Sequence, residues 1–398
     1  MNIKKLRKDF YFLQKKNYIY FDNACNSLRP DCVVEKINEY YKEYPVCAGR
    51  SNYALAEKLT TDLLGVRKNI AKFISAKEDE IIFTKNTTES INLLANSLDL
   101  KEGDIVLTTD KEHNSNLIPW IKLKSKGVIH KTINSNPDNT FNIERLSKVL
   151  CPEVKLLALG MSSNLDGVSI PAKEIIDLAH KNGSLVLLDA AQSAISEKID
   201  VKYLDVDFLA FSGHKILGPS GTGVLFGKKD LLEKLGSFLV GGSTVHSSSY
   251  DDFELADIPE RFEAGLQNFS GILGLGEAIK YLEKIGLKNI QKQKLVLNEY
   301  LSNELLKIDK LHIIGPEEAS RRSGIVSFYI DDIDSHQLSI MLDRSAGIMT
   351  RSGQHCVHSW FKSREVASSL RVSMSFYNTL DEVKKFVDEL NNIIKILR

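Results

Sequence analysis

Short apolar runs alternate with helical patterns along residues 81–226 of this chain. Most of the runs are continuous rather than alternating, which is typical of strands that are covered by helices on both faces. The predicted strands are Ile81–Thr84, Ile105–Thr108, Val128–Thr132, Leu156–Leu159, Leu185–Leu188, Phe208–Phe211 and Val224–Phe226. Helical patterns fit between them, for example at Thr88–Ser97 and Ala172–Lys181. We therefore predict an α/β domain with a large, mostly parallel sheet.

The pattern changes after Gly265. Helices are predicted at Leu273–Lys284, Ile290–Ile308 and Ser335–Leu342, and strands at His312–Ile314, Ile325–Tyr329, Ile348–Arg351 and Arg371–Ser375. The last helix opens with a capping-box signature, Thr379 to Glu382. These elements predict a smaller α+β domain at residues 266–398, with residues 1–16 packed on it, beside a large domain at residues 17–265.

Charge and composition exclude several classes of protein. The 398 residues carry 52 Lys+Arg and 52 Asp+Glu, so we expect no bulk attraction to nucleic acid or to an acidic membrane. No apolar stretch reaches the length of a membrane span, and we expect a soluble, cytoplasmic protein. Five scattered cysteines fit neither a disulfide scaffold nor a metal site, so we predict no metal.

A lysine follows the predicted strand Phe208–Phe211 within the turn Ser212-Gly213-His214-Lys215, and a glycine-rich stretch comes next. A lysine at the end of a buried strand is poorly solvated, which favours the uncharged amine that Schiff-base chemistry needs. The neighbouring glycines would let the backbone approach a planar ligand. A plain surface turn is the alternative interpretation of this segment.

Two further strand ends carry matching chemistry. Asp189 ends a buried strand, where a carboxylate could keep a pyridine nitrogen protonated, although a helix cap is the alternative role. Gln192, three residues on, could donate a hydrogen bond to a phenolic oxygen. Thr87 and Thr88 begin a helix after another strand, which is typical of a phosphate site. Together these sites predict pyridoxal 5'-phosphate (PLP) as the cofactor, held by Lys215 as a Schiff base.

The chain resembles the class V aminotransferase superfamily, and within it the group II (SufS/selenocysteine-lyase-like) cysteine desulfurases. The resemblance runs from Tyr20-Phe-Asp22-Asn23-Ala24 to the C-terminal helix and includes the turn at Lys215. It implies the type I PLP-dependent transferase fold and a homodimer. It also implies conversion of L-cysteine to L-alanine. The sulfur would pass to an acceptor protein, either SufE-like or SufU-like or a scaffold, for iron–sulfur cluster or other thio-cofactor assembly.

The resemblance also implies roles for individual residues. The segment Glu112-His113 looks like the family segment whose histidine stacks on the cofactor and moves protons, so His113 is expected to be catalytic. Asn164, Ser212 and His214 fall on cofactor positions, as do the residues already named. The residues implied in substrate binding are Asn23, Arg50, Arg351 and Arg371, with Arg371 on the substrate carboxylate.

Cys356 lies in the segment Arg351-Ser-Gly-Gln-His-Cys356, which is similar to the family segment that presents the nucleophilic cysteine. Arg351, His355 and His358 are candidate cations to favour its thiolate; a buried small side chain is the alternative role. His355-Cys356-Val-His358 is too crowded for tetrahedral zinc.

The chain departs from the family pattern at Gly49, Asn114, Met161-Ser162, Leu266 and Gln354. Another class V lyase or aminotransferase, such as a selenocysteine lyase, and a non-catalytic homologue are therefore the alternative functions.

Overall fold

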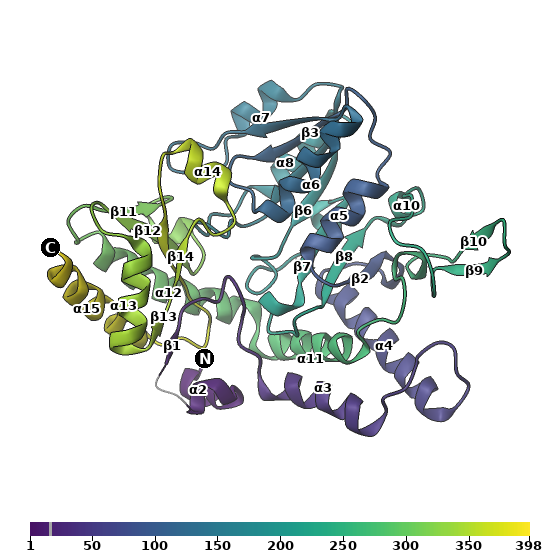
Figure 1. The fold of residues 1–398 in the computed structure, drawn as a ribbon, viewed down its shortest axis with the longest axis horizontal. Coiled ribbons are helices and arrows are strands. Elements are labelled where there is room, and N and C mark those ends of the chain that lie inside the picture. Colours follow the sequence, from purple (N-terminus) through teal and green to yellow (C-terminus); the bar gives the residue numbers. More distant parts are fainter. Residues whose placement is uncertain (16–17) are drawn as a thin grey trace.

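The computed structural model describes residues 1–15 and 18–398 and contains a seven-stranded sheet in the order β2-β8-β7-β6-β5-β3-β4 (Figure 1). Its strands are β2 (Ile81–Thr84), β3 (Ile105–Thr109), β4 (Ile129–Ile133), β5 (Val154–Gly160), β6 (Leu185–Asp189), β7 (Phe208–Ser212) and β8 (Gly223–Gly227). Six of them run in the same direction, and only β8 is antiparallel, pairing with β7 on one side and β2 on the other. The predicted strands and the α/β class are confirmed.

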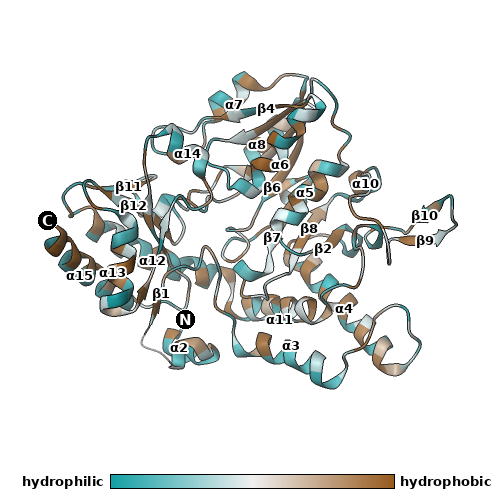
Figure 2. Cartoon of the chain, in the orientation of Figure 1, coloured by the Kyte–Doolittle hydropathy of each residue, from teal (hydrophilic) through white to brown (hydrophobic). Residues whose placement is uncertain are grey.

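Successive side chains of a strand point to opposite faces of a sheet, and in the central strands β6, β7 and β8 nearly all of them are buried, whereas the edge strand β4 is mostly exposed. In β7, Leu209 and Phe211 pack on one side with the helices α4 (Ala54–Phe73), α8 (Ala172–Lys181) and α11 (Phe269–Ile285). Phe208 and Ala210 pack on the other side with α5 (Thr87–Ser97) and α6 (Ile118–Lys122). A sheet covered in this way needs apolar side chains at every position, which explains the continuous runs in the sequence. In Figure 2 the hydrophobic colour follows α11 and the strands of this sheet.

The helices have the following bounds in the structure. They are α1 (Ile3–Leu6), α2 (Tyr11–Lys15), α3 (Asp31–Glu43), α4 (Ala54–Phe73), α5 (Thr87–Ser97), α6 (Ile118–Lys122), α7 (Ile143–Val149), α8 (Ala172–Lys181), α9 (Val201–Leu204), α10 (Lys229–Leu232), α11 (Phe269–Ile285), α12 (Leu287–Leu305), α13 (Ser335–Ala346), α14 (His358–Ser363) and α15 (Leu380–Leu397). The capping box predicted at the start of the last helix is present, with Thr379 and Glu382 bonding reciprocally. Among the helices of the described residues, none combines the length and the apolarity needed to cross a membrane.

A second, four-stranded antiparallel sheet has the order β11-β12-β15-β14. Its strands are β11 (Leu311–Ile314), β12 (Ile325–Ile330), β14 (Arg351–Gly353) and β15 (Ser369–Ser373). Buried residues of α12, α13 and α15 join it in a separate core. The long helix α12 follows α11 and joins the two parts of the fold, because Ile290 lies in the core of the larger sheet and Leu297, Leu301 and Leu305 lie in the core of the smaller one (Figure 1).

Three features differ from the sequence prediction. The run 348–351 is not one strand: β13 (Ile348–Met349) pairs with β1 (Ile19–Tyr20), and β14 pairs with β15. The sequence did not predict β1, because this strand has only two residues and its segment shows no strand periodicity. The hairpin of β9 (Val245–Ser248) and β10 (Phe253–Leu255) projects from the molecule, and its exposed polar residues carry no strand signal (Figure 1).

The two main cores do not follow chain order. Phe10 and residues of α11 lie in the core of the larger sheet, whereas Ile19 and Phe21 lie in the core of the smaller one. The domain boundary predicted at residues 16–17 falls outside the described residues, and the boundary at 265–266 stays a prediction.

Candidate active site

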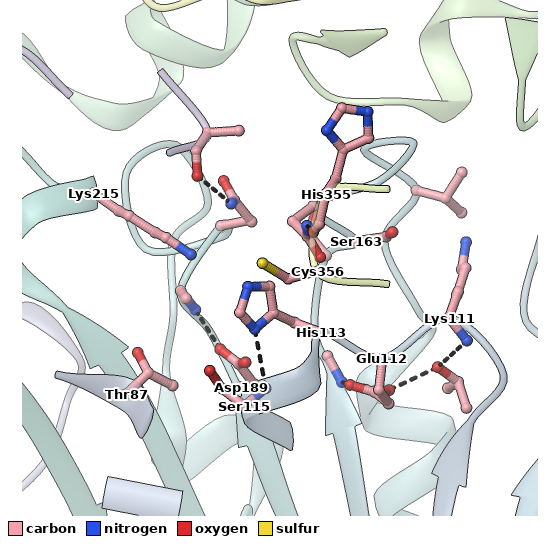
Figure 3. Close-up of a pocket in the computed structure, with 18 of the residues that line it drawn as sticks. Thr87, Lys111, Glu112, His113, Ser115, Ser163, Asp189, Lys215, His355 and Cys356 are labelled. Carbon is pink, nitrogen blue, oxygen red and sulfur yellow. Dashed lines mark hydrogen bonds between the residues drawn. The ribbon is translucent and has the colours of Figure 1, made fainter. Parts of the chain in front are cut away.

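A cavity of about 280 Å³ opens at the carboxyl ends of the parallel strands, between the two sheets (Figure 3). Parallel strands end at one edge of a sheet, which brings residues that are distant in sequence into one place. The cavity gathers most of the predicted site residues: Thr87, Thr88, His113, Asn164, Asp189, Gln192, Ser212, His214, Lys215, Arg351, Cys356 and Arg371. Their individual roles remain predictions.

Lys215 follows β7 in a single 3-10 turn, Gly213–Lys215. A Cβ on Gly213 would lie 2.1 Å from Thr222 Oγ1, so this tight turn requires glycine. Burial lowers the pKa of Lys215, although the Asp189 carboxylate opposes that shift. Burial in turn raises the pKa of Asp189, opposed by Lys215 and by the hydrogen bond from Ala191 N (2.9 Å). The cavity therefore holds the partly buried amine of Lys215 and the buried carboxyl group of Asp189.

Hydroxyl groups cluster at the start of α5. Thr87 donates its backbone N–H to Ser212 Oγ (2.9 Å), and the two hydroxyl groups also lie 2.7 Å apart. Thr88 Oγ1 lies 2.7 Å from Ser115 Oγ. A helix N-terminus with several hydroxyl groups favours an anion, as predicted for the phosphate end of the cofactor.

His113 lines the cavity, and its side chain lies next to that of Cys356 (Figure 3). Its Nδ1 accepts a hydrogen bond from Ser115 N (3.1 Å), which leaves Nε2 for a proton. Burial, followed by repulsion from Lys215 and Arg371, lowers the pKa of His113 to about 3. The ring is therefore neutral at physiological pH.

Glu112, beneath His113, is a buried residue that the sequence prediction left out of the site. It accepts hydrogen bonds from Thr109 Oγ1 (2.7 Å), Asn116 Nδ2 (2.8 Å) and Gly160 N (3.0 Å). Burial nevertheless raises the pKa of Glu112 to about 7. Its side chain ties the His113 segment to the end of β5.

Cys356 sits in a loop whose backbone is held on both sides. His355 and Cys356 have φ angles of 49° and 61°, a left-handed conformation that side chains rarely adopt and that costs roughly 1–3 kcal/mol per residue. Asn164 Nδ2 donates to the His355 carbonyl (2.8 Å), and Asn114 N donates to the Cys356 carbonyl (2.8 Å). The Cys356 sulfur and the Lys215 amine point into the same space (Figure 3).

His355 does not supply a positive charge to Cys356, contrary to the expectation from the sequence. Burial, then repulsion from Arg371 and Arg351, lowers the pKa of His355 to about 2, so the ring stays neutral. His358 is exposed, does not line the cavity, and faces Asn114 Nδ2 at 2.9 Å. Arg351 is the remaining candidate cation of the three.

Arg371 lies on β15 opposite Arg351 of β14 and is 2% exposed. Its Nη2 forms an ion pair with Asp22 Oδ1 (3.0 Å), and its Nη1 donates to the Asn164 carbonyl (3.0 Å). Its Nε is buried without a partner among the described residues. Arg351 donates from Nη1 to Cys25 Sγ (3.0 Å), and Cys25 also lines the cavity.

Two predicted residues lie elsewhere. The buried Asn23 does not line the cavity, because its amide donates to the Ser373 carbonyl (2.7 Å) and its oxygen accepts from the Tyr377 hydroxyl. Arg50 lines a different hollow together with Leu266, and it donates to Ser243 Oγ (2.8 Å).

Gln192 lines the cavity, and its side-chain amide donates to the Ala24 carbonyl (2.8 Å). Across residues 1–15 and 18–398, no group of three or more His, Cys, Asp or Glu side chains is placed to hold a metal.

The residues of the cavity fit PLP. Lys215 offers an amine for the aldehyde, and Asp189 offers a carboxylate for the pyridinium nitrogen. Thr87, Thr88 and Ser212 offer donors for a phosphate. The Lys215 amine would bond to the aldehyde carbon, and the buried Asp189 carboxylate would gain the pyridinium N–H as a donor.

The fold and this site define a PLP-dependent enzyme, and the comparisons with known proteins agree. Residues 19–386 match the family model "Aminotransferase class-V". A curated relative, "Probable cysteine desulfurase" of Methanothermobacter thermautotrophicus, is 36% identical over 99% of this chain and 98% of its own length. The apo structure of the cysteine desulfurase from Thermococcus onnurineus NA1 has a TM-score of 0.95 at 36% identity and covers 98% of each chain.

This chain belongs to the aminotransferase class-V family, and PLP is its cofactor. A more distant solved structure, 22% identical with a TM-score of 0.84 over 96% of this chain and 98% of the other, has the same fold. It is a C-DES mutant with glycine covalently linked to its PLP cofactor.

Proposed function

We propose that this chain is a group II cysteine desulfurase, which converts L-cysteine to L-alanine and retains the sulfur as a persulfide on Cys356. One observation carries the proposal: the Cys356 thiol lines the same cavity as Lys215 and is presented by a strained, doubly anchored loop. An enzyme that needs no protein thiol would gain nothing from the cost of this backbone conformation. The names of the relatives support the same activity.

The protein groups have separable tasks in this reaction. Bound PLP supplies electron withdrawal from the substrate Cα. Lys215 would hold the cofactor until the substrate amine takes its place, and its released amine, with a lowered pKa, would then accept and return a proton at Cα. Asp189 stabilises positive charge on the pyridine ring. His113, neutral with Nε2 free of a described partner, orients the ring plane and can carry a proton near the substrate.

The sulfur step is balanced without an external oxidant. The Cys356 thiolate attacks the substrate sulfur, so an S–S bond forms while the substrate Cβ–S bond breaks. The bonding electron pair of the Cβ–S bond returns to the substrate carbon, which takes up a proton and becomes the methyl group of alanine. The products are L-alanine and the Cys356 persulfide, and a thiol acceptor can then take the outer sulfur atom.

Arg371 is proposed to bind the substrate carboxylate. Its guanidinium is already fixed by Asp22 and the Asn164 carbonyl, and its unpartnered buried Nε marks a donor without an acceptor. A planar guanidinium matches a carboxylate with two hydrogen bonds. Arg351, on the neighbouring strand, is the second candidate for this task.

Mass spectrometry tests the proposal. After incubation with L-cysteine and without reductant, the peptide that contains Cys356 should gain one sulfur atom, and L-alanine should accumulate. Cys356→Ser should lose at least about 100-fold in alanine formation from cysteine, the scale of removing a directly reacting group, while it still binds PLP. Cys32→Ser, remote from the cavity, is the matched control. Full activity of Cys356→Ser toward cysteine would overturn the proposal.

A homodimer and a sulfur-acceptor protein belong to the same proposal, with the cytoplasm as its compartment and iron–sulfur cluster or thio-cofactor assembly as the destination of the sulfur. Leu266 is 76% exposed in the hollow beside Arg50, and Leu64 in that hollow is also exposed. Exposed apolar side chains around a hollow support an interface between subunits. Size-exclusion chromatography with light scattering would measure the mass, and a monomer at micromolar concentration would contradict the dimer.

A further inference from the structure

A second polar cavity, of about 670 Å³, lies where the larger sheet's loops meet α12 and the smaller sheet. It shares no lining residue with the active-site cavity. Six of its lining side chains are cationic: Lys198, Lys288, Lys292, Lys294, Arg321 and Arg322. Glu197 is the only carboxylate that lines it among the described residues.

Lys294 is the central group of this cavity. It lies on α12, is 6% exposed, and donates to Ser196 Oγ (3.0 Å). An ammonium has three N–H donors, and no carboxylate of the described residues lies within ion-pair distance of this one. Burial lowers the pKa of Lys294 to about 8, with Glu197 opposing the shift. A buried ammonium with spare donors costs free energy unless an acceptor is bound.

The neighbouring charges compensate Lys294 only in part. Glu197 accepts from Ser169 Oγ (2.9 Å), and burial raises its pKa, which favours the neutral acid. Arg322 is 4% exposed, and its Nε and Nη1 have no partner among the described residues. The Asp166 carboxylate, which stabilises the positive charge of Arg322, already forms an ion pair with Lys111 (2.9 Å).

The cavity also lies at a junction between the two parts of the fold. Gly167, on the loop of the larger sheet, accepts a hydrogen bond from Ser323 N (2.8 Å). A Cβ on Gly167 would lie 2.8 Å from Ser323 Oγ, and its φ of 73° also favours glycine. A ligand held by Lys294, Ser169 and Arg322 would therefore contact both sides of this junction, whereas Arg321 is already paired with Asp138 (3.0 Å).

We propose that this cavity is a binding site for an anion of the phosphate class, separate from the cofactor site. A phosphate dianion offers enough acceptors for the spare Lys294 donors and for the exposed lysines at the rim. Its charge matches the excess of cations, which a single neutral or monoanionic ligand would not. The volume admits either inorganic phosphate or a small phosphate ester.

Thermal unfolding of the PLP-loaded enzyme tests this site, because bound PLP already fills the phosphate position of the active site. Sodium phosphate should raise the Tm saturably, by about 1–3 °C near ten times Kd, relative to sodium chloride at equal ionic strength. Isothermal titration calorimetry with inorganic phosphate should give the same Kd. A small phosphate ester, glycerol 3-phosphate, should compete with inorganic phosphate for the site.

The variant Lys294→Met distinguishes a lysine that binds a ligand from a lysine that only stabilises the fold. The variant should lose the saturable response while its Tm without phosphate stays equal or rises, because a buried charge is removed. Lys234→Met, at an exposed lysine without an ion pair among the described residues, should keep the response. The exposed rim variant Lys292→Gln should weaken binding by roughly 2- to 10-fold, and it decides the matter if Lys294→Met does not fold. No saturable response in the wild type, or an unchanged Kd in both cavity variants, would overturn the proposal.

Discussion

Arg351 Nη1 lies 3.0 Å from Cys25 Sγ, within the cavity that also holds Cys356 and Arg371. The two residues are far apart in sequence: Cys25 follows β1, and Arg351 begins β14. In this arrangement the sulfur of Cys25 accepts from a guanidinium that could otherwise serve the substrate. The cavity thus contains two thiols, and only one of them lies on the strained loop.

This contact predicts an effect of Cys25 on substrate binding rather than on sulfur capture. Cys25→Ala should free Arg351 and lower the KM for cysteine by about 2- to 10-fold, equivalent to a net hydrogen bond of about 0.5–1.5 kcal/mol. The kcat should change little, and the persulfide should still form on Cys356. Steady-state kinetics with alanine detection measures both constants. A collapse of kcat would instead make Cys25 part of the sulfur step.

Asp189 should matter for kcat. Asp189→Asn keeps the shape of the side chain but removes the charge that stabilises a protonated pyridine nitrogen. We expect kcat to fall by about 10²–10³-fold, the scale typical of removing one preorganised electrostatic partner. The absorbance of bound PLP should show that the variant still holds the cofactor. Wild-type kcat would show that another group carries the charge.

Arg371→Lys should raise KM strongly although it keeps the positive charge. Lysine cannot reproduce the planar pair of hydrogen bonds, nor reach Asp22 and the Asn164 carbonyl together. We expect an increase of at least about tenfold in KM, which corresponds to about 1.4 kcal/mol. Arg351→Lys, on the adjacent strand, is the matched comparison. A larger effect in Arg351→Lys would assign the carboxylate to that residue.

The raised pKa of Glu112 predicts that the stability of the folded protein depends on pH. Its pKa is raised to about 7 in the folded protein, above the ordinary value near 4.5. The folded state therefore binds the proton more tightly, so this contribution to stability is complete below about pH 4.5 and is lost as the pH rises through 7. Glu112→Gln should flatten the fall in Tm between pH 5 and 8, measured by calorimetry on the PLP-loaded enzyme. An identical slope in the variant would contradict the shift.

The sequence by itself determined the larger sheet and predicted most of the residues that line the cavity. Continuous apolar runs mark strands with two buried faces, and the residues that follow such runs meet at one sheet edge. Asp189, Thr87 and Lys215 could be found in this way because Asp189 ends its strand and the other two lie within three residues of the end of theirs. The local sequence pattern is sufficient to predict a site residue when the position of that residue along its strand also sets its position in the fold.

Only the tertiary structure decided the rest, because it depends on which distant segments pack together. The contact between Cys25 and Arg351, the neutral state of His355 and the placement of Arg50 away from the cavity arise from packing between elements far apart in the chain. The same holds for Lys294, an ordinary helical lysine in sequence, which becomes a buried cation when α12 meets the loops of the larger sheet. The solvent exposure and the pKa of a side chain depend on all the residues around it, and for these side chains those residues come from distant parts of the chain.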